Sequence, residues 1–210
     1  MKTPSTELMD ILEVIAQLNE QLLDALVLSA STVGSPFPLP AALRSNFADL
    51  PGEHRRRVAR CGIALADGAF GDPQRWRSAD PLIQRDSRSA AEHCMDWLPS
   101  SQGVGLAHSV MTVAWLTVHT RPYLTGVLLG MHDAVAGIFQ RLSILEVSHL
   151  AWSYSTWIRP RWANRMDIWK GVLQAAAVPS DRLRARLTLR CLKASVDPTT
   201  LAALSFKSAA

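Results

Sequence analysis

Cysteine is scarce in this sequence of 210 residues: Cys61, Cys94 and Cys191 are widely spaced and odd in number. Neither a disulfide framework nor a CxxC metal site is indicated by this spacing, and buried free thiols are the simpler expectation. The sequence also lacks a Gly-x-Ser-x-Gly turn, a glycine-rich phosphate loop and a His-Glu-x-x-His motif. We therefore expect no catalytic residue, no metal site and no cofactor, in a protein that is not an enzyme.

Long uninterrupted hydrophobic runs are also missing. The most apolar stretch, residues 104–131, is interrupted by two histidines, Arg121 and Pro122, and no run reaches the length that spans a bilayer. Glu7 and Asp10 stand where a secretory signal would have an apolar core. The sequence predicts a soluble cytoplasmic protein without membrane insertion, which reaches the inner face of a membrane only through partners.

Lysine is nearly absent among the cations, because 18 of the 22 basic residues are arginine. The guanidinium of arginine is a rigid fork that suits carboxylates, phosphates and aromatic rings. The formal net charge is only +4, so the basic excess by itself does not indicate nucleic acid. Nucleic acid is not the expected partner, although the arginines leave it open.

Patterns typical of strands and hairpins are absent, whereas helical periodicity runs through most of the sequence. Apolar residues recur every three or four positions from Leu8 to Leu26, behind an N-cap at Thr3 and a proline at position 4. Further helices are expected at 41–47, 53–66, 90–98, 104–118, 122–130 and 133–142. Helices begin again at the capping box Ser143–Glu146, at Asn164 and at Ser180. We predict an all-α fold, an irregular array of about eight to ten helices with no significant sheet.

The chain divides in three by composition. Residues 1–67 are expected to form an N-terminal helical lobe, and residues 89–210 a C-terminal helical array. Between them, residues 68–88 alternate in charge and contain two prolines, which predicts a loop or linker with at most one turn of helix around Trp76.

A segment rich in arginine and tryptophan is the most distinctive feature. Tryptophan and arginine dominate the energetics of protein interfaces, and they also stack on each other within a fold. The segment therefore allows three interpretations: buried tryptophans covered by arginines, a protein-binding face, or a nucleic-acid contact. We take as candidate partner-binding residues Trp157, Arg159, Arg161, Trp162, Arg165 and Trp169.

The same segment carries a family resemblance. The run Trp157-Ile158-Arg159-Pro160-Arg161-Trp162, followed by Ile168-Trp169 and Val172-Leu173, resembles accessory proteins of bacterial type III secretion, the SctK-like group that includes the rhizobial nodulation protein NolU. Chain length and a helical, arginine-rich composition are also similar. The resemblance implies a non-enzymatic protein that binds cytoplasmic ring or ATPase-complex components of the secretion apparatus and, in rhizobia, influences nodulation.

A second, more local resemblance covers residues 128–173. The run from Leu129 to Ala136, then Leu142-Ser143, Leu150-Ala151 and residues 159–162, looks like the flagellar transcriptional regulator FlhD. That family is all-α and binds promoter DNA as part of a hetero-oligomer. The alternative expectation is thus a DNA-binding regulator.

Overall fold

The expected all-α class is confirmed by a computed structural model, which describes residues 4–79, 97–98 and 100–195. Its α-helices are α1 (Pro4–Ser31), α2 (Arg44–Ala48), α3 (Gly52–Ala59), α4 (Pro73–Ala79), α5 (Ser100–Thr120), α6 (Thr125–Leu129), α7 (Asp133–Phe139), α8 (Ile144–Ser153), α9 (Met166–Ala177) and α10 (Asp181–Ser195). Short 3-10 turns occupy Ala41–Leu43, Pro122–Leu124 and Ser155–Trp157. The strands β1 (Ala66–Asp67) and β2 (Arg159–Pro160) form a minimal antiparallel pair.

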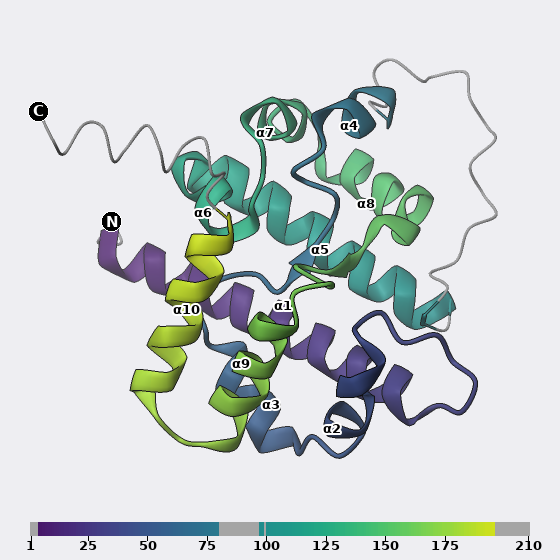
Figure 1. Cartoon of the computed structure of the whole chain (residues 1–210). Helices are drawn as coiled ribbons and strands as arrows, with labels where there is room; N and C mark the ends of the chain where they lie inside the picture. The colour runs from purple at the N-terminus through teal and green to yellow at the C-terminus, as the bar shows by residue number, and fades with distance from the viewer. Residues whose placement is uncertain (1–3, 80–96, 99, 196–210) are drawn as a thin grey trace, which may run out of the picture.

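The two long helices, α1 and α5, form the centre of the array and pack against each other (Figure 1). Helices α2 and α3 pack on α1, and α8 packs along α5. Helix α9 contacts both α3 and α10, so the C-terminal pair of described helices packs on the N-terminal part of the array. None of the described helices combines the length and the apolar character needed to cross a membrane.

The predicted helix starts are confirmed at two of three places in the C-terminal half. Ser143 and Glu146 form the capping box that begins α8, and the Ser180 hydroxyl accepts the Leu183 amide at 3.4 Å at the start of α10. The cap predicted at Asn164 is wrong, because the N-cap of α9 is Arg165. The Arg165 amide donates to the Trp162 carbonyl at 2.8 Å, and this turn delays the first helical residue.

The helix predicted over residues 53–66 is too long, since α3 ends at Ala59. Gly62 adopts a left-handed conformation, with φ of 75°, which carries the chain away from the helix axis. The buried side chain of Asn19 then holds the new path: its amide donates to the carbonyls of Ala59 at 2.9 Å and Ile63 at 2.8 Å. A long-range contact from α1, absent from the local pattern, thus ends the helix.

The expected loop at residues 68–88 contributes to the core. Trp76, on α4, is fully buried, and its ring centroid lies 5.1 Å from that of Phe139 and 5.3 Å from that of Trp157. Buried residues from both predicted lobes belong to one hydrophobic cluster, which includes Phe70 and Trp76. Residues 68–79 therefore join the two halves through shared packing. Residues 80–96, with Cys94 and most of the helix expected at 90–98, lie outside the described residues.

Buried free thiols are confirmed for Cys61 and Cys191. Burial raises the pKa of Cys61 to about 11 and that of Cys191 to about 12. At pH 8, a thiol with that pKa is a reactive thiolate about one time in a thousand or less.

We therefore expect native Cys94→Ser protein to react with iodoacetamide at pH 8 only as fast as it unfolds. Both remaining thiols should be alkylated within minutes in guanidinium chloride. Mass spectrometry over a time course measures this difference, and rapid native labelling of both thiols would contradict the buried positions.

Candidate functional site

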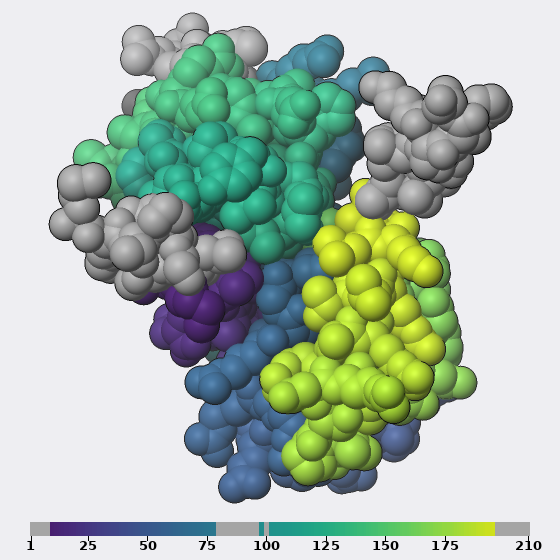
Figure 2. Space-filling view, turned by 90° about the vertical axis from the view of Figure 1, so that its left-hand side faces the viewer, coloured from purple at the N-terminus to yellow at the C-terminus, as the bar shows by residue number. Residues whose placement is uncertain are grey.

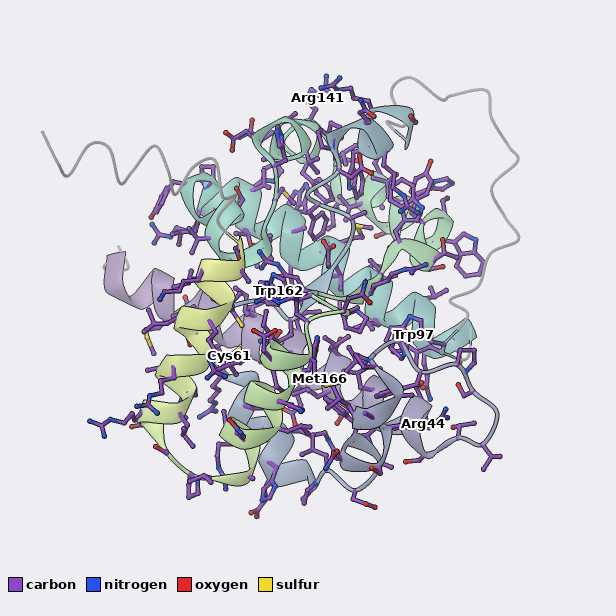
Figure 3. The ribbon with its side chains drawn as sticks, viewed as in Figure 1. Arg44, Cys61, Trp97, Arg141, Trp162 and Met166 are labelled. Carbon is purple, nitrogen blue, oxygen red and sulfur yellow. The ribbon has the colours of Figure 1, made fainter. Side chains whose placement is uncertain are left out.

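Residues 155–169 pass through the middle of the fold, and β2 anchors them. Arg159 pairs with Asp67 and Pro160 with Ala66 across the strand pair, and the Arg161 amide donates to the Leu65 carbonyl at 2.6 Å. Figure 3 shows Trp162 near the middle of the view, on the segment that leads into α9. Backbone pairing thus fixes this segment against the residues between α3 and α4.

Arg161 is an interior residue, with only 7% of its surface exposed. Its guanidinium donates from Nη1 to the Leu128 carbonyl at 3.3 Å and the Ala64 carbonyl at 3.5 Å, and from Nη2 to the Ser195 hydroxyl at 2.9 Å. It also lies over the ring of Trp162, 4.4 Å from the centroid. One side chain therefore connects the segment that precedes β1, the last turn of α6 and the end of α10.

The Arg161 guanidinium is bonded to two backbone carbonyls, of which that of Leu128 lies in the last turn of α6. Arginine near a helix C-terminus bonds the last carbonyls and interacts favourably with their partial negative charge. Burial still lowers the pKa of Arg161 to about 10, although the nearby Asp67 opposes that shift. Removal from water likewise raises the pKa of Asp67, whose carboxylate accepts the Phe70 amide at 3.1 Å. Arg161 remains a cation at neutral pH, and its role is to hold these segments together.

Gly130 provides the room for this guanidinium. The residue has a left-handed φ of 67°, and a Cβ placed on it would lie 2.1 Å from Nη2 of Arg161. No carbon atom approaches a nitrogen that closely without a bond, so any side chain at position 130 displaces Arg161. The guanidinium of Arg161 thus occupies the space that a side chain at position 130 would fill.

Trp162 has an unusual backbone for a large residue, with φ of 55°. Its carbonyl accepts the indole N–H of Trp169 at 3.1 Å, which helps to hold the turn. Trp169 itself is fully buried, and its ring meets that of Phe47 edge-on at 5.9 Å. Trp169 therefore belongs to the core, and Trp162 is half-buried beside it.

The other three candidate residues lie closer to the surface. Trp157 is half-buried, with the guanidinium of Arg75 4.3 Å from its ring centroid. Arg159 is exposed, and Arg165 is exposed but forms two hydrogen bonds to the Asp167 carboxylate, at 2.9 and 3.0 Å. The six candidates therefore do not make one exposed patch. Their geometry matches the first interpretation, tryptophans covered by arginine.

A different exposed surface was missed by the sequence reasoning. Helix α8 turns three large apolar side chains toward solvent: Leu145 is 78% exposed, Trp152 65% and Ile144 42%. Leu145, Ser148 and Trp152 follow the i, i+3, i+7 spacing of one helical stripe. The opposite face of α8, with Val147, Leu150 and Ala151, is buried. We call Leu145, Ser148 and Trp152 the α8 stripe.

A groove between α1 and α5 continues the α8 stripe. Ser148 Oγ lies 3.1 Å from Nε2 of His108, on α5, and His108 lines a hollow of about 190 Å³ between α5 and α1. A second hollow of about 560 Å³ follows along the same two helices, and Gln21 and Ser109 line both. Buried Leu18 and Leu106 provide apolar surface at the bottom of the two hollows. The α8 stripe therefore adjoins this partly apolar groove at the contact between Ser148 and His108.

The described ranges contain no group of three histidine, cysteine, aspartate or glutamate side chains placed to hold a metal ion. Glu146, which has a histidine three residues later, is engaged as the capping-box acid, with its carboxylate 2.8 Å from the Ser143 amide. Comparison with known proteins adds no further assignment: the chain matches no family model, no curated protein and no solved structure.

Proposed function

We propose that this protein is a non-enzymatic binding protein that docks a helical partner on the α8 stripe and the adjoining α1–α5 groove. The observation that carries the proposal is the exposure of Leu145 and Trp152 on one face of a well-capped helix. Single apolar residues at a surface are ordinary, but aligned large ones beside a partly apolar groove are typical of protein interfaces. An amphipathic helix laid in such a groove covers all of this surface at once.

The composition of α8 favours a protein partner over DNA. Helices α7 and α8 follow each other across a short turn, the order of a helix-turn-helix motif, in which the second helix enters the major groove. Helix α8 contains no lysine or arginine, and its outward face carries Leu145 and Trp152 beside Ser148 and His149. A recognition helix without arginine or lysine lacks the side chains that most often contact phosphates and guanine edges.

The resemblance to the SctK-like group directs the proposal to type III secretion. In this proposal the protein is an accessory component at the cytoplasmic side of the apparatus, and its partners are ring or ATPase-complex proteins. The residues that carry the resemblance are mostly interior or half-buried, so they support a fold in common with that group. We therefore assign partner binding to α8. A DNA-binding regulator is the competing function.

The proposal predicts that Leu145→Ser with Trp152→Ser weakens partner binding at least about tenfold, since interface tryptophans often contribute about 2 kcal/mol or more. Both side chains are exposed, so the free energy of unfolding should change by less than about 0.5 kcal/mol. The measurement is quantitative co-purification with tagged ring and ATPase-complex proteins, together with effector export in a strain carrying the variant.

Val33→Ser is the matched control, because Val33 is 98% exposed and lies just after α1, outside the stripe. It should leave both readouts unchanged. Equal co-purification by the α8 variant and the control would contradict the proposed surface. A sequence-specific shift of promoter fragments that falls steeply with salt, without any secretion partner, would replace the proposal with the regulator function.

A further inference from the structure

The positive charge of the chain is concentrated on one helix. Helix α10 contains four arginines, one lysine and one aspartate, a net charge of +4, which equals the formal net charge of all 210 residues. The rest of the chain therefore has as many acidic as basic residues. Figure 2 shows α10, in yellow, at the surface of the molecule. A net charge of +4 on one surface helix makes α10 a candidate binding surface for an acidic partner.

The outward face of α10 combines this charge with an apolar residue. Arg182, Arg186, Leu189 and Lys193 are exposed and follow one another at spacings of four, three and four residues, while Leu187 and Cys191 are buried on the inner face. Arg184 is engaged by Asp181 at 2.7 Å. Leu189 is 57% exposed and lies between the cations of this row. We call Arg182, Arg186, Leu189 and Lys193 the α10 face.

The cations and the leucine of the α10 face can each be matched by a group on an acidic amphipathic helix. Residues four apart on a helix are separated by about 6 Å along its axis, so carboxylates at the same spacing on a second helix can meet Arg182 and Arg186 in register. The arginine fork binds a carboxylate through two parallel hydrogen bonds. The exposed Leu189 requires an apolar group opposite it, which an amphipathic helix has between its acidic residues.

Two other anionic partners fit less well. A phosphate backbone presents charge alone and leaves Leu189 uncovered, and a basic stripe for nucleic acid needs no leucine at its centre. Helices that lie in a membrane interface bury a broad apolar face in the lipid, whereas α10 has already placed its apolar side, Leu187 and Cys191, in the protein core. We infer that the α10 face binds an acidic amphipathic helix of a partner protein, as a second docking surface separate from the α8 stripe.

The test uses purified full-length protein and four labelled probes. The first is an amphipathic peptide of five helical turns with glutamates four residues apart and leucines between them. The second is a scrambled peptide of the same composition, the third a DNA duplex of two turns, and the fourth vesicles rich in phosphatidylserine. We expect the amphipathic peptide to bind, and the scrambled peptide to bind at least about tenfold more weakly, because only the helical phase aligns charge and leucine.

Two variants locate the interaction. Arg182→Glu with Arg186→Glu should weaken peptide binding at least about tenfold, and Leu189→Ser about fivefold, with unchanged circular dichroism and melting temperature. Arg56→Glu with Arg77→Glu makes the same change of charge at two exposed arginines on α3 and α4, and should alter binding less than about twofold.

Several results would overturn the inference. These are no binding of the amphipathic peptide, equal binding of the scrambled one, equal losses in the two charge-reversal variants, or no effect of Leu189→Ser. Tighter binding of the duplex or of the vesicles than of the peptide would assign the α10 face to nucleic acid or to lipid instead. Because the α8 stripe is untouched in these variants, the outcome is independent of the proposed function.

Discussion

Gly130→Ala is expected to lower the free energy of unfolding by at least about 3 kcal/mol. A left-handed backbone disfavours alanine by about 1–2 kcal/mol, and the new Cβ would collide with the Arg161 guanidinium, 2.1 Å from its Nη2. Arg161 would then lose its bonds to the Leu128 carbonyl and the Ser195 hydroxyl, which leaves a buried cation without its partners. Chemical denaturation of the purified variant measures the loss.

Gly34→Ala separates the cost of the left-handed backbone from the cost of the collision with Arg161. Gly34 also has a left-handed φ, 77°, but nothing lies within 4 Å of a Cβ built there. Its substitution should cost only the backbone term, about 1–2 kcal/mol. In an Arg161→Ala background, Gly130→Ala should likewise fall to that smaller cost, because the colliding group is gone. Equal losses at positions 34 and 130, or no coupling to Arg161, would contradict the close approach.

The helices with strong local signals could be predicted from the sequence. The capping box at Ser143 and Glu146 is complete within four residues, and the structure has it as predicted. The apolar spacing from residue 8 onward similarly predicts α1 without help from other elements. Those signals act between neighbours in the chain, so a single sequence contains them in full.

Features that depend on distant residues could not be predicted in this way. The end of α3 is set by Asn19, some 40 positions earlier, and Arg161 is buried because carbonyls from residues 64 and 128 meet it. Nothing around Arg161 in the sequence distinguishes it from the exposed Arg159. The candidate set therefore mixed interior and surface residues, since composition alone does not tell which arginine has internal partners.

The α8 stripe was within reach of sequence reasoning. Once Ser143 fixes the first residue of the helix, the buried positions Val147, Leu150 and Ala151 define its inner face. Leu145 and Trp152 then fall on the outer face by helical geometry alone. The neighbouring groove could not be predicted from the sequence, because the α1 residues that line it are more than 100 positions away from α8 along the chain.

Trp169→Ala is expected to lower the free energy of unfolding by about 3–5 kcal/mol, the usual range for a buried tryptophan replaced by alanine. Trp169 has no exposed surface, packs on Phe47 and donates its indole N–H to the Trp162 carbonyl, so its loss leaves both a cavity and an unpaired acceptor.

Trp152→Ala is the matched comparison, because the same atoms are removed from a side chain that is 65% exposed. Its stability should change by less than about 0.5 kcal/mol, while partner binding falls. Adding Trp162→Ala to Trp169→Ala should cost less than the sum of the two single changes, since the two residues share one turn. Denaturant unfolding and co-purification of the three single variants and the double variant test this assignment. A Trp169→Ala protein as stable as the original, or a Trp152→Ala protein that unfolds, would contradict the assignment of Trp169 to the core and of Trp152 to the binding surface.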